Sequence, residues 1–221
     1  MQNSSCASSI ALILVLAATA AHAQTGSDGG WYGGISLGQS RVKFADDFLS
    51  FPGATGESLS KDETGGAYKL FAGYRHTRHF ALEGGYTDFG SFSATNDIAA
   101  IALFGPGSLS FKLKSSGFHL DTVGILPIGG KFEIFGRLGV IYTTTKATFS
   151  GTGSVLVAAP GVPPNSKHSE LNLKPGIGAE YRFSQALGLR LEAEQALKVG
   201  DANTTGEGDI RVFSLGLTSR F

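Results

Sequence analysis

The feature that most constrains the fold is a two-residue alternation of apolar and mixed side chains, which begins at Trp31. Successive side chains of a strand point to opposite faces, so each alternating segment has one apolar and one mixed face. A helix would repeat every 3.6 residues instead. The segments lie at 31–38, 68–75, 80–87, 117–126, 132–143, 171–183, 187–196 and 210–221. The pattern therefore predicts an all-β fold with eight strands, of the length that a tilted strand needs to cross a bilayer.

The connections between these segments alternate in length. The short ones lie at 76–79, 127–131 and 184–186. The long ones are rich in Gly, Ser, Thr, Asp and Asn and lie at 45–65, 91–112, 149–168 and 198–209. An up-and-down barrel has tight turns at one end and long loops at the other. We therefore expect an eight-stranded antiparallel up-and-down barrel, with both chain ends on the periplasmic side of an outer membrane.

Alternation alone does not say which face is outside, because a soluble ligand-binding barrel of the lipocalin kind also alternates, with its apolar face inward. The mixed face here is rich in Gly and Ser, as at Gly34, Ser36 and Gly38, which suits a crowded lumen. Aromatic residues of the apolar face gather near strand ends, where membrane girdles lie. They are Trp31, Tyr74, Phe80, Tyr142, Tyr181, Phe183, Phe213 and Phe221. These observations favour a transmembrane β-barrel, whose apolar face meets lipid.

The first 23 residues are expected to be a cleaved signal peptide. A short apolar run at 10–18 precedes Ala21-His22-Ala23, an A-x-A cleavage pattern. The barrel domain is then residues 24–221, exported to the outer membrane. The chain's one cysteine, Cys6, leaves with the signal, so the domain has no disulfide or thiolate site.

If the apolar parity meets lipid, the charged residues of the other parity point inward. They are Lys69, Arg75, Glu83, Asp121, Glu133, Arg137, Lys174, Glu180, Arg182, Arg190, Glu192 and Glu194. Turning an Arg or Lys to the bilayer midplane instead costs about 2–4 kcal/mol. Side chains nearly fill the interior of an eight-stranded barrel, so these charges must pair with one another.

In order, spacing and phase, several short pieces resemble the transmembrane domain of OmpA-type outer-membrane proteins, over essentially all of the expected mature sequence. The pieces are Trp31-Tyr32-Gly33-Gly34, Leu82-Glu83-Gly84-Gly85-Tyr86, Phe135-Gly136-Arg137-Leu138-Gly139, Gly178-Ala179-Glu180-Tyr181, Arg190-Leu191-Glu192 and 214–221. The resemblance implies a structural outer-membrane protein surrounded by lipid and lipopolysaccharide. It also implies that the barrel-assembly machinery recognises the C-terminal Phe221.

The resemblance further implies a mid-lumen network of carboxylates and bases. Glu83, Glu180 and Arg190 fall at its positions, but the Lys expected on the fourth strand is Val123 here, which leaves Arg137 as an alternative base. The candidate ion-pair network is Glu83, Asp121, Arg137, Glu180, Arg190 and Glu192. A network of this kind is either a structural plug, the interpretation we favour, or a narrow, gated ion path.

The sequence offers no catalytic, cofactor-binding or metal-binding motif. His168-Ser169-Glu170 has the residue types of a hydrolase triad, but neighbours on a strand point to opposite faces. A lipid-modifying enzyme is therefore the less favoured alternative. The 18 basic and 18 acidic residues balance, which argues against a nucleic-acid partner.

Two apolar runs, at 98–104 and 155–159, fall in the expected long loops. Exposed runs of this kind mark contact surfaces, which would make the protein a surface-interaction module. The alternative is that the strands extend beyond the membrane and the runs pack on each other.

Overall fold

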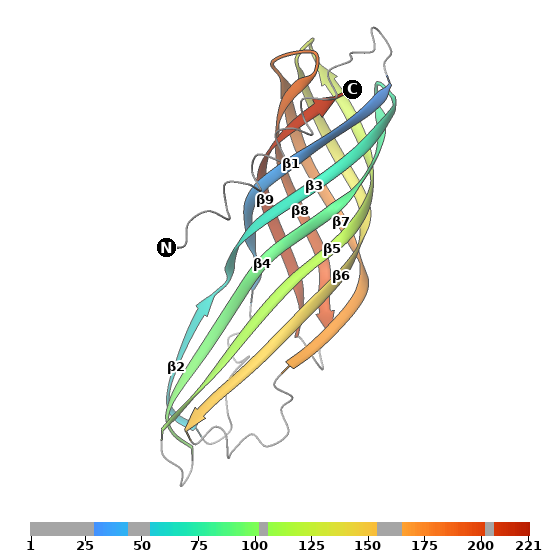
Figure 1. The fold of residues 1–221 in the computed structure, drawn as a ribbon. Helices are drawn as coiled ribbons and strands as arrows, with labels where there is room; N and C mark the ends of the chain where they lie inside the picture. Colours follow the sequence, from blue (N-terminus) through green and yellow to red (C-terminus); the bar gives the residue numbers. More distant parts are fainter. Residues whose placement is uncertain (1–28, 44–53, 102–105, 154–164, 202–205) are drawn as a thin grey trace, which may run out of the picture.

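The structure, a computed structural model, describes residues 29–43, 54–101, 106–153, 165–201 and 206–221. Within these ranges the chain forms nine strands (Figure 1). They are β1 (Gly30–Arg41), β2 (Ala54–Asp62), β3 (Thr64–Thr77), β4 (Phe80–Ile101), β5 (Gly107–Ile128), β6 (Phe132–Gly153), β7 (Asn165–Arg182), β8 (Leu187–Asp201) and β9 (Gly206–Arg220). No helix within them has the length and hydropathy to cross a membrane. The expected signal peptide lies outside these ranges and stays a prediction.

Eight of the strands close into a ring. Each pairs antiparallel with its neighbour in the order β1-β3-β4-β5-β6-β7-β8-β9, and β9 pairs back with β1. The remaining strand, β2, pairs with β4 beyond the end of β3, from which only Glu63 separates it. Both chain ends of the barrel lie together at the short-turn end, where the Phe221 amide donates to the Trp31 carbonyl at 2.9 Å. The eight-stranded up-and-down barrel is confirmed.

The apolar face is on the outside. Leu82, Leu191 and Leu215 are 48%, 59% and 49% exposed, respectively. Glu83, one residue from Leu82, is fully buried, and Arg190, beside Leu191, is 5% exposed. Because apolar side chains cover the exterior and charged ones fill the interior, the barrel suits lipid rather than water as its surroundings.

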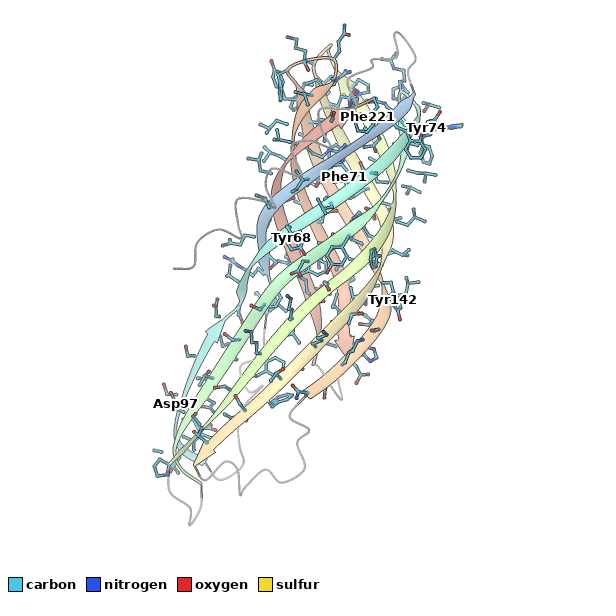
Figure 2. The ribbon with its side chains drawn as sticks, viewed as in Figure 1. Tyr68, Phe71, Tyr74, Asp97, Tyr142 and Phe221 are labelled. Carbon is cyan, nitrogen blue, oxygen red and sulfur yellow. The ribbon has the colours of Figure 1, made fainter. Side chains whose placement is uncertain are left out.

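Two aromatic girdles bound the apolar band (Figure 2). At the short-turn end, the rings of Trp31 and Tyr74 are 5.2 Å apart. At the other end Phe118 packs on Tyr86, also at 5.2 Å, and pairs across the strands with Tyr142. The ten residue steps of β6 from Phe132 to Tyr142 span about 25 Å along the axis of a tilted barrel, which matches the apolar band of outer-membrane barrels.

Beyond Tyr142 the strands of one side continue as a segment that we call the extension, which Figure 1 shows at the bottom. The loop predictions were wrong here: 91–101, 107–112, 149–153, 165–168 and 198–201 are strand, as are 54–62 and 206–209. In the extension the polarity of the alternation inverts. Phe111 and Leu113 point inward and are buried, whereas Lys112 and Lys114 point outward. A strand that faces water outside uses the same Ser, Thr, Asn and Gly that loops use, which explains the error.

Inward side chains of the extension and of the adjoining end of the barrel form one apolar core, which we call the apolar core of the extension. Its buried members are Val42, Ala67, Phe89, Phe92, Ala94, Phe111, Leu113, Ile141, Ala147, Ala196, Val199, Ile210 and Val212. Ile98 is also buried, at 2% exposure. The first residue of the apolar run at 98–104 therefore packs inside an extended strand and is not part of an exposed contact surface. The run's residues 102–104, and the second run at 155–159, lie outside the described residues.

A β-bulge between Asp88 and Ser91 marks the point where β4 exchanges its partner β3 for β2. Gly90 lies in this bulge with a φ of +79°, and a Cβ there would overlap the Gly66 carbonyl oxygen. Glycine adopts this backbone conformation without strain. The bulge lets β4 remain continuous from the membrane into the extension.

Candidate functional site in the lumen

The centre of the lumen holds Arg137 of β6 among four carboxylates. Its Nη1 donates to Asp121 at 3.2 Å and to Glu194 at 3.0 Å, and its Nη2 donates to Glu83 at 2.9 Å and to Glu192. The side chains of Arg137, Glu83, Asp121 and Glu192 are fully buried. A planar guanidinium fork suits this role, since it directs several donors at separate acceptors.

Three further cations complete what we call the central network: Lys69, Lys174 and Arg190. The Lys69 ammonium contacts Glu192 and lies 2.8 Å from Glu194. The Lys174 ammonium lies 2.8 Å from Asp121 and 2.7 Å from Glu194. Each carboxylate of the network thus has at least two cations in contact, which offsets the high cost of burying its charge.

Arg190 of β8 joins this network to the rest of the lumen. Its Nη1 donates to Glu83 at 2.7 Å and its Nε to Glu180 at 3.0 Å. Its guanidinium carbon lies 4.8 Å from the ring centres of both Phe71 and Phe135. Cation–π contact at these distances stabilises a desolvated guanidinium by about 2 kcal/mol or more.

A second group of ion pairs, the short-turn cluster, lies between Arg190 and the short turns. Arg75 Nη1 donates hydrogen bonds to both carboxylate oxygens of Glu133, at 3.1 and 3.0 Å. Arg182 lies 3.2 Å from Glu133, and Arg220 bridges Glu133 at 3.0 Å and Glu180 at 2.9 Å. The lumen therefore contains the short-turn cluster, the central network and the apolar core of the extension, one above another.

Strand register explains why these residues meet. Glu83 pairs directly with Asp121 across β4 and β5, and Glu180 pairs with Arg190 across β7 and β8. Close packing is possible because Gly139, opposite Asp121, has no side chain. A Cβ at that position would overlap the Asp121 carboxylate and the Leu120 carbonyl oxygen.

All six residues of the candidate network are inward-facing and connected by the ion pairs described above. Val123, at the position of the expected lysine, is buried and pairs directly with Arg137, the proposed alternative base. The candidate set omitted Lys69, Lys174 and Glu194, although alternation had already placed all three inward.

Two more participants were missed altogether. Arg220 follows the inward parity of its strand, so the alternation was sufficient to find it. The Tyr32 hydroxyl donates to Glu83 at 2.8 Å, and its inward position follows from Trp31 facing outward.

The packed lumen leaves little room for solvent beside the central network. A cavity of about 10 Å³ lies there, lined by residues that include Ser36, Lys69, Thr87 and Ser214. This volume is close to that of one water molecule. The ion pairs, together with the apolar core on their extension side, thus make a closed interior in the part of the chain that the structure describes.

The histidines do not form a hydrolase triad with the neighbouring polar residues. His168 lies 3.8 Å from Glu170, but the Ser169 hydroxyl between them contacts Thr144 at 2.9 Å. His119 lies 3.0 Å from Asp121, inside the closed lumen. Among the described residues, no three His, Cys, Asp or Glu side chains are grouped as metal ligands.

Several known proteins similar to this chain are outer-membrane proteins. Outer membrane protein A of Shigella flexneri is 30% identical over 216 residues, which cover 96% of this chain and 55% of the relative. Outer membrane protein A of Yersinia pseudotuberculosis is 27% identical over 217 residues, covering 96% and 54%. The chain therefore spans about half the length of these relatives. An uncharacterized protein of Coxiella burnetii is 28% identical over 200 residues, covering 83% of this chain and 78% of that protein.

The crystal structure of Neisserial surface protein A has the same fold, with a TM-score of 0.52 at 13% identity, and the match covers 87% of this chain and 97% of that one. Residues 10–221 match the sequence model of a family described as the outer membrane protein beta-barrel domain. With its closed ring, its lipid-facing apolar band and this match over almost its whole length, the chain belongs to that family and is an outer-membrane β-barrel.

Proposed function

We propose that this barrel is a structural, non-conducting component of the outer membrane rather than a channel or an enzyme. The observation that supports this function is the central network. The single side chain of Arg137 on β6 forms ion pairs with carboxylates of β4, β5 and β8, so side chains meet across the middle of the lumen. Moving an ion past it requires breaking several fully desolvated ion pairs at once.

Conductance recording tests this proposal. We expect the refolded wild-type protein to give no steady openings in a planar bilayer, because the network and the apolar core fill the lumen. Arg78→Gln provides a matched control for Arg190→Gln, since Arg78 is an exposed residue of a short turn. Steady unitary openings of the wild type that change size in Arg190→Gln but not in Arg78→Gln would contradict the proposal and support the gated channel.

Within the described ranges, no histidine side chain is hydrogen-bonded to a hydroxyl group that could act as a nucleophile, so the enzyme alternative has no such pair in its favour. His119 is enclosed in the lumen, and His79, at a short turn, contacts the Ile125 carbonyl through Nδ1 at 3.1 Å. Expression of the protein is accordingly expected to leave the mass of lipid A unchanged.

We further propose that the extension projects outside the cell and presents a rigid surface there. It reaches about 25–30 Å beyond Tyr142, if the eleven following residues of β6 keep the barrel's tilt. The apolar core that it shares with the adjoining end of the barrel makes it a packed structure rather than a set of loops. A rigid, solvated sheet of this kind suits surface contact.

Cysteine labelling in intact cells tests this orientation. The single native cysteine lies in the expected signal peptide, so an introduced cysteine is unique in the barrel. We expect a membrane-impermeant maleimide to label Asp97→Cys, an exposed position near the tip of the extension, in intact cells (Figure 2). Gln185→Cys, an exposed position in a short turn, is expected to react only after the outer membrane is opened. The reverse labelling pattern would place the extension in the periplasm.

Recognition of Phe221 by the assembly machinery stays a prediction. Its side chain is 41% exposed at the short-turn end, next to Trp31.

A further inference from the structure

Three lysines lie side by side on the outer face of the barrel, just beyond the apolar band. Lys114 of β5 pairs directly with Lys146 of β6, which pairs directly with Lys167 of β7. All three are exposed. Adjacent strands are about 4.8 Å apart, and like charges directly opposite each other destabilise a sheet. The arrangement therefore needs a source of negative charge.

The protein itself supplies little of that charge. Lys114 lies 3.7 Å from Asp88, and this pair is largely open to solvent on the lysine side. On β5, β6 and β7 the two neighbouring rows carry neutral polar groups and one more lysine: Ser116, Thr144 and Ser169 on the membrane side, and Lys112, Thr148 and Asn165 on the side of the extension's tip. The carboxylates of these rows lie farther around the sheet, at Asp88 of β4 and Asp62 of β2. Lys146 and Lys167 thus face outward with no carboxylate on β5, β6 or β7 in their own row or in these two rows.

The height of the row identifies what it faces. Phe118, Tyr142 and Leu171 form the last lipid-facing row, four residues nearer the membrane on each strand. Four residues of a tilted strand correspond to roughly 10 Å along the barrel axis. The lysines therefore lie at the level of lipid headgroups. By strand register this level is between Tyr142 and Asp97, which Figure 2 labels.

The opposite side of the barrel repeats this arrangement. Arg41 of β1 pairs directly with Arg211 of β9, and both are exposed. On each strand the arginine lies two residues farther toward the extension than the pair formed by Gln39 and Phe213. Phe213 is 66% exposed and faces lipid. Cations thus occur at the same boundary on both sides of the cylinder.

We propose that this set, the basic belt of Arg41, Lys114, Lys146, Lys167 and Arg211, binds the phosphate groups of lipid A in the outer leaflet. Lysine stems pack along the apolar wall while their ammonium groups reach the headgroups. A cation near an anionic membrane surface gains on the order of 1 kcal/mol. The belt offsets its own repulsion by binding these phosphates and fixes the depth of the barrel in the leaflet. The assignment of the leaflet rests on the orientation proposed above.

The test measures stabilisation by lipid A. Wild-type protein is refolded into phosphatidylcholine vesicles that contain increasing fractions of diphosphoryl lipid A, with a chelator present to remove bridging divalent cations. Thermal unfolding is followed by gel mobility. Because lipid A is present in both leaflets of such vesicles, the result does not depend on orientation in the cell. Failure of the belt and failure of the proposed orientation are therefore distinguishable.

We expect diphosphoryl lipid A to raise the unfolding temperature of the wild type, and dephosphorylated lipid A to have little effect. In Lys146→Gln/Lys167→Gln the fraction of lipid A needed for half of the shift is expected to rise about 30-fold, from the loss of two headgroup cations. The control Arg78→Gln/Lys131→Gln removes two exposed cations at the short turns and is expected to behave as the wild type.

In pure phosphatidylcholine the control is expected to unfold as the wild type does, since its substituted side chains are exposed. Lys146→Gln/Lys167→Gln is expected to unfold there at no lower a temperature than the wild type, because it removes the repulsion between the two lysines. Equal stabilisation by the phosphorylated and dephosphorylated lipids would overturn the proposal, as would equal losses in the two variants. Stabilisation by soluble heparin that requires Lys146 and Lys167, with no response to lipid A, would assign the belt to a different class of partner and also overturn it.

Discussion

Arg137→Ala is expected to destabilise the barrel by at least about 3–5 kcal/mol, which is the usual consequence of removing one partner of a buried ion pair. The effect is large because Arg137 contacts four carboxylates, and the substitution leaves Glu83, Glu192 and their neighbours repelling one another. Urea titration in phospholipid vesicles, followed by the fluorescence of Trp31, the chain's single tryptophan, measures the free energy of unfolding.

Two further variants separate the loss of charge from a general disturbance of packing. Arg137→Lys keeps the charge but loses the planar fork, so we expect an intermediate loss of stability. Adding Glu192→Gln to Arg137→Ala removes one of the uncompensated carboxylates and is expected to recover part of the loss. Arg78→Ala, at an exposed turn, is expected to change the free energy of unfolding by less than about 0.5 kcal/mol. A loss in Arg137→Ala no larger than in Arg78→Ala would show that the network does not hold the barrel together.

Leu138→Arg is expected to cost about 2–4 kcal/mol, because it turns a cation toward the middle of the bilayer. Leu138 is 54% exposed and lies near the centre of the lipid-facing stretch of β6, between Phe132 and Tyr142. The same urea titration measures the effect.

Ser150→Arg provides the matched control on the same strand. Ser150 is exposed and points outward like Leu138, but it lies in the extension, where the outer face meets water. We expect the free energy of unfolding of Ser150→Arg to stay within about 0.5 kcal/mol of the wild-type value. Similar losses for the two variants would mean that β6 has the same surroundings along its whole length, which would contradict the boundary near Tyr142.

Much of the fold was predictable because a membrane barrel imposes one simple rule on its strands. Each residue of the spanning segments faces either lipid or the lumen, so the phase of the alternation assigned Leu82 outward and Glu83 inward without knowledge of their neighbours. The same rule was sufficient to find Arg220 and Tyr32, which were missed. It does not hold in the extension, where the outside is water and the inside is apolar.

The amino-acid sequence by itself determined the number of spanning strands, the lipid-facing side chains and the set of charges inside, because all three depend on the parity of neighbours along one strand. The tertiary structure alone decided which charges meet. Arg137 contacts Glu192 and Glu194 of β8, two strands away from its own around the ring, because tilt and closure bring them across the lumen. It also decided that the polar segments of the extension are strands, since only the pairing among β4, β5, β6 and β7 distinguishes a solvated strand from a loop of the same composition.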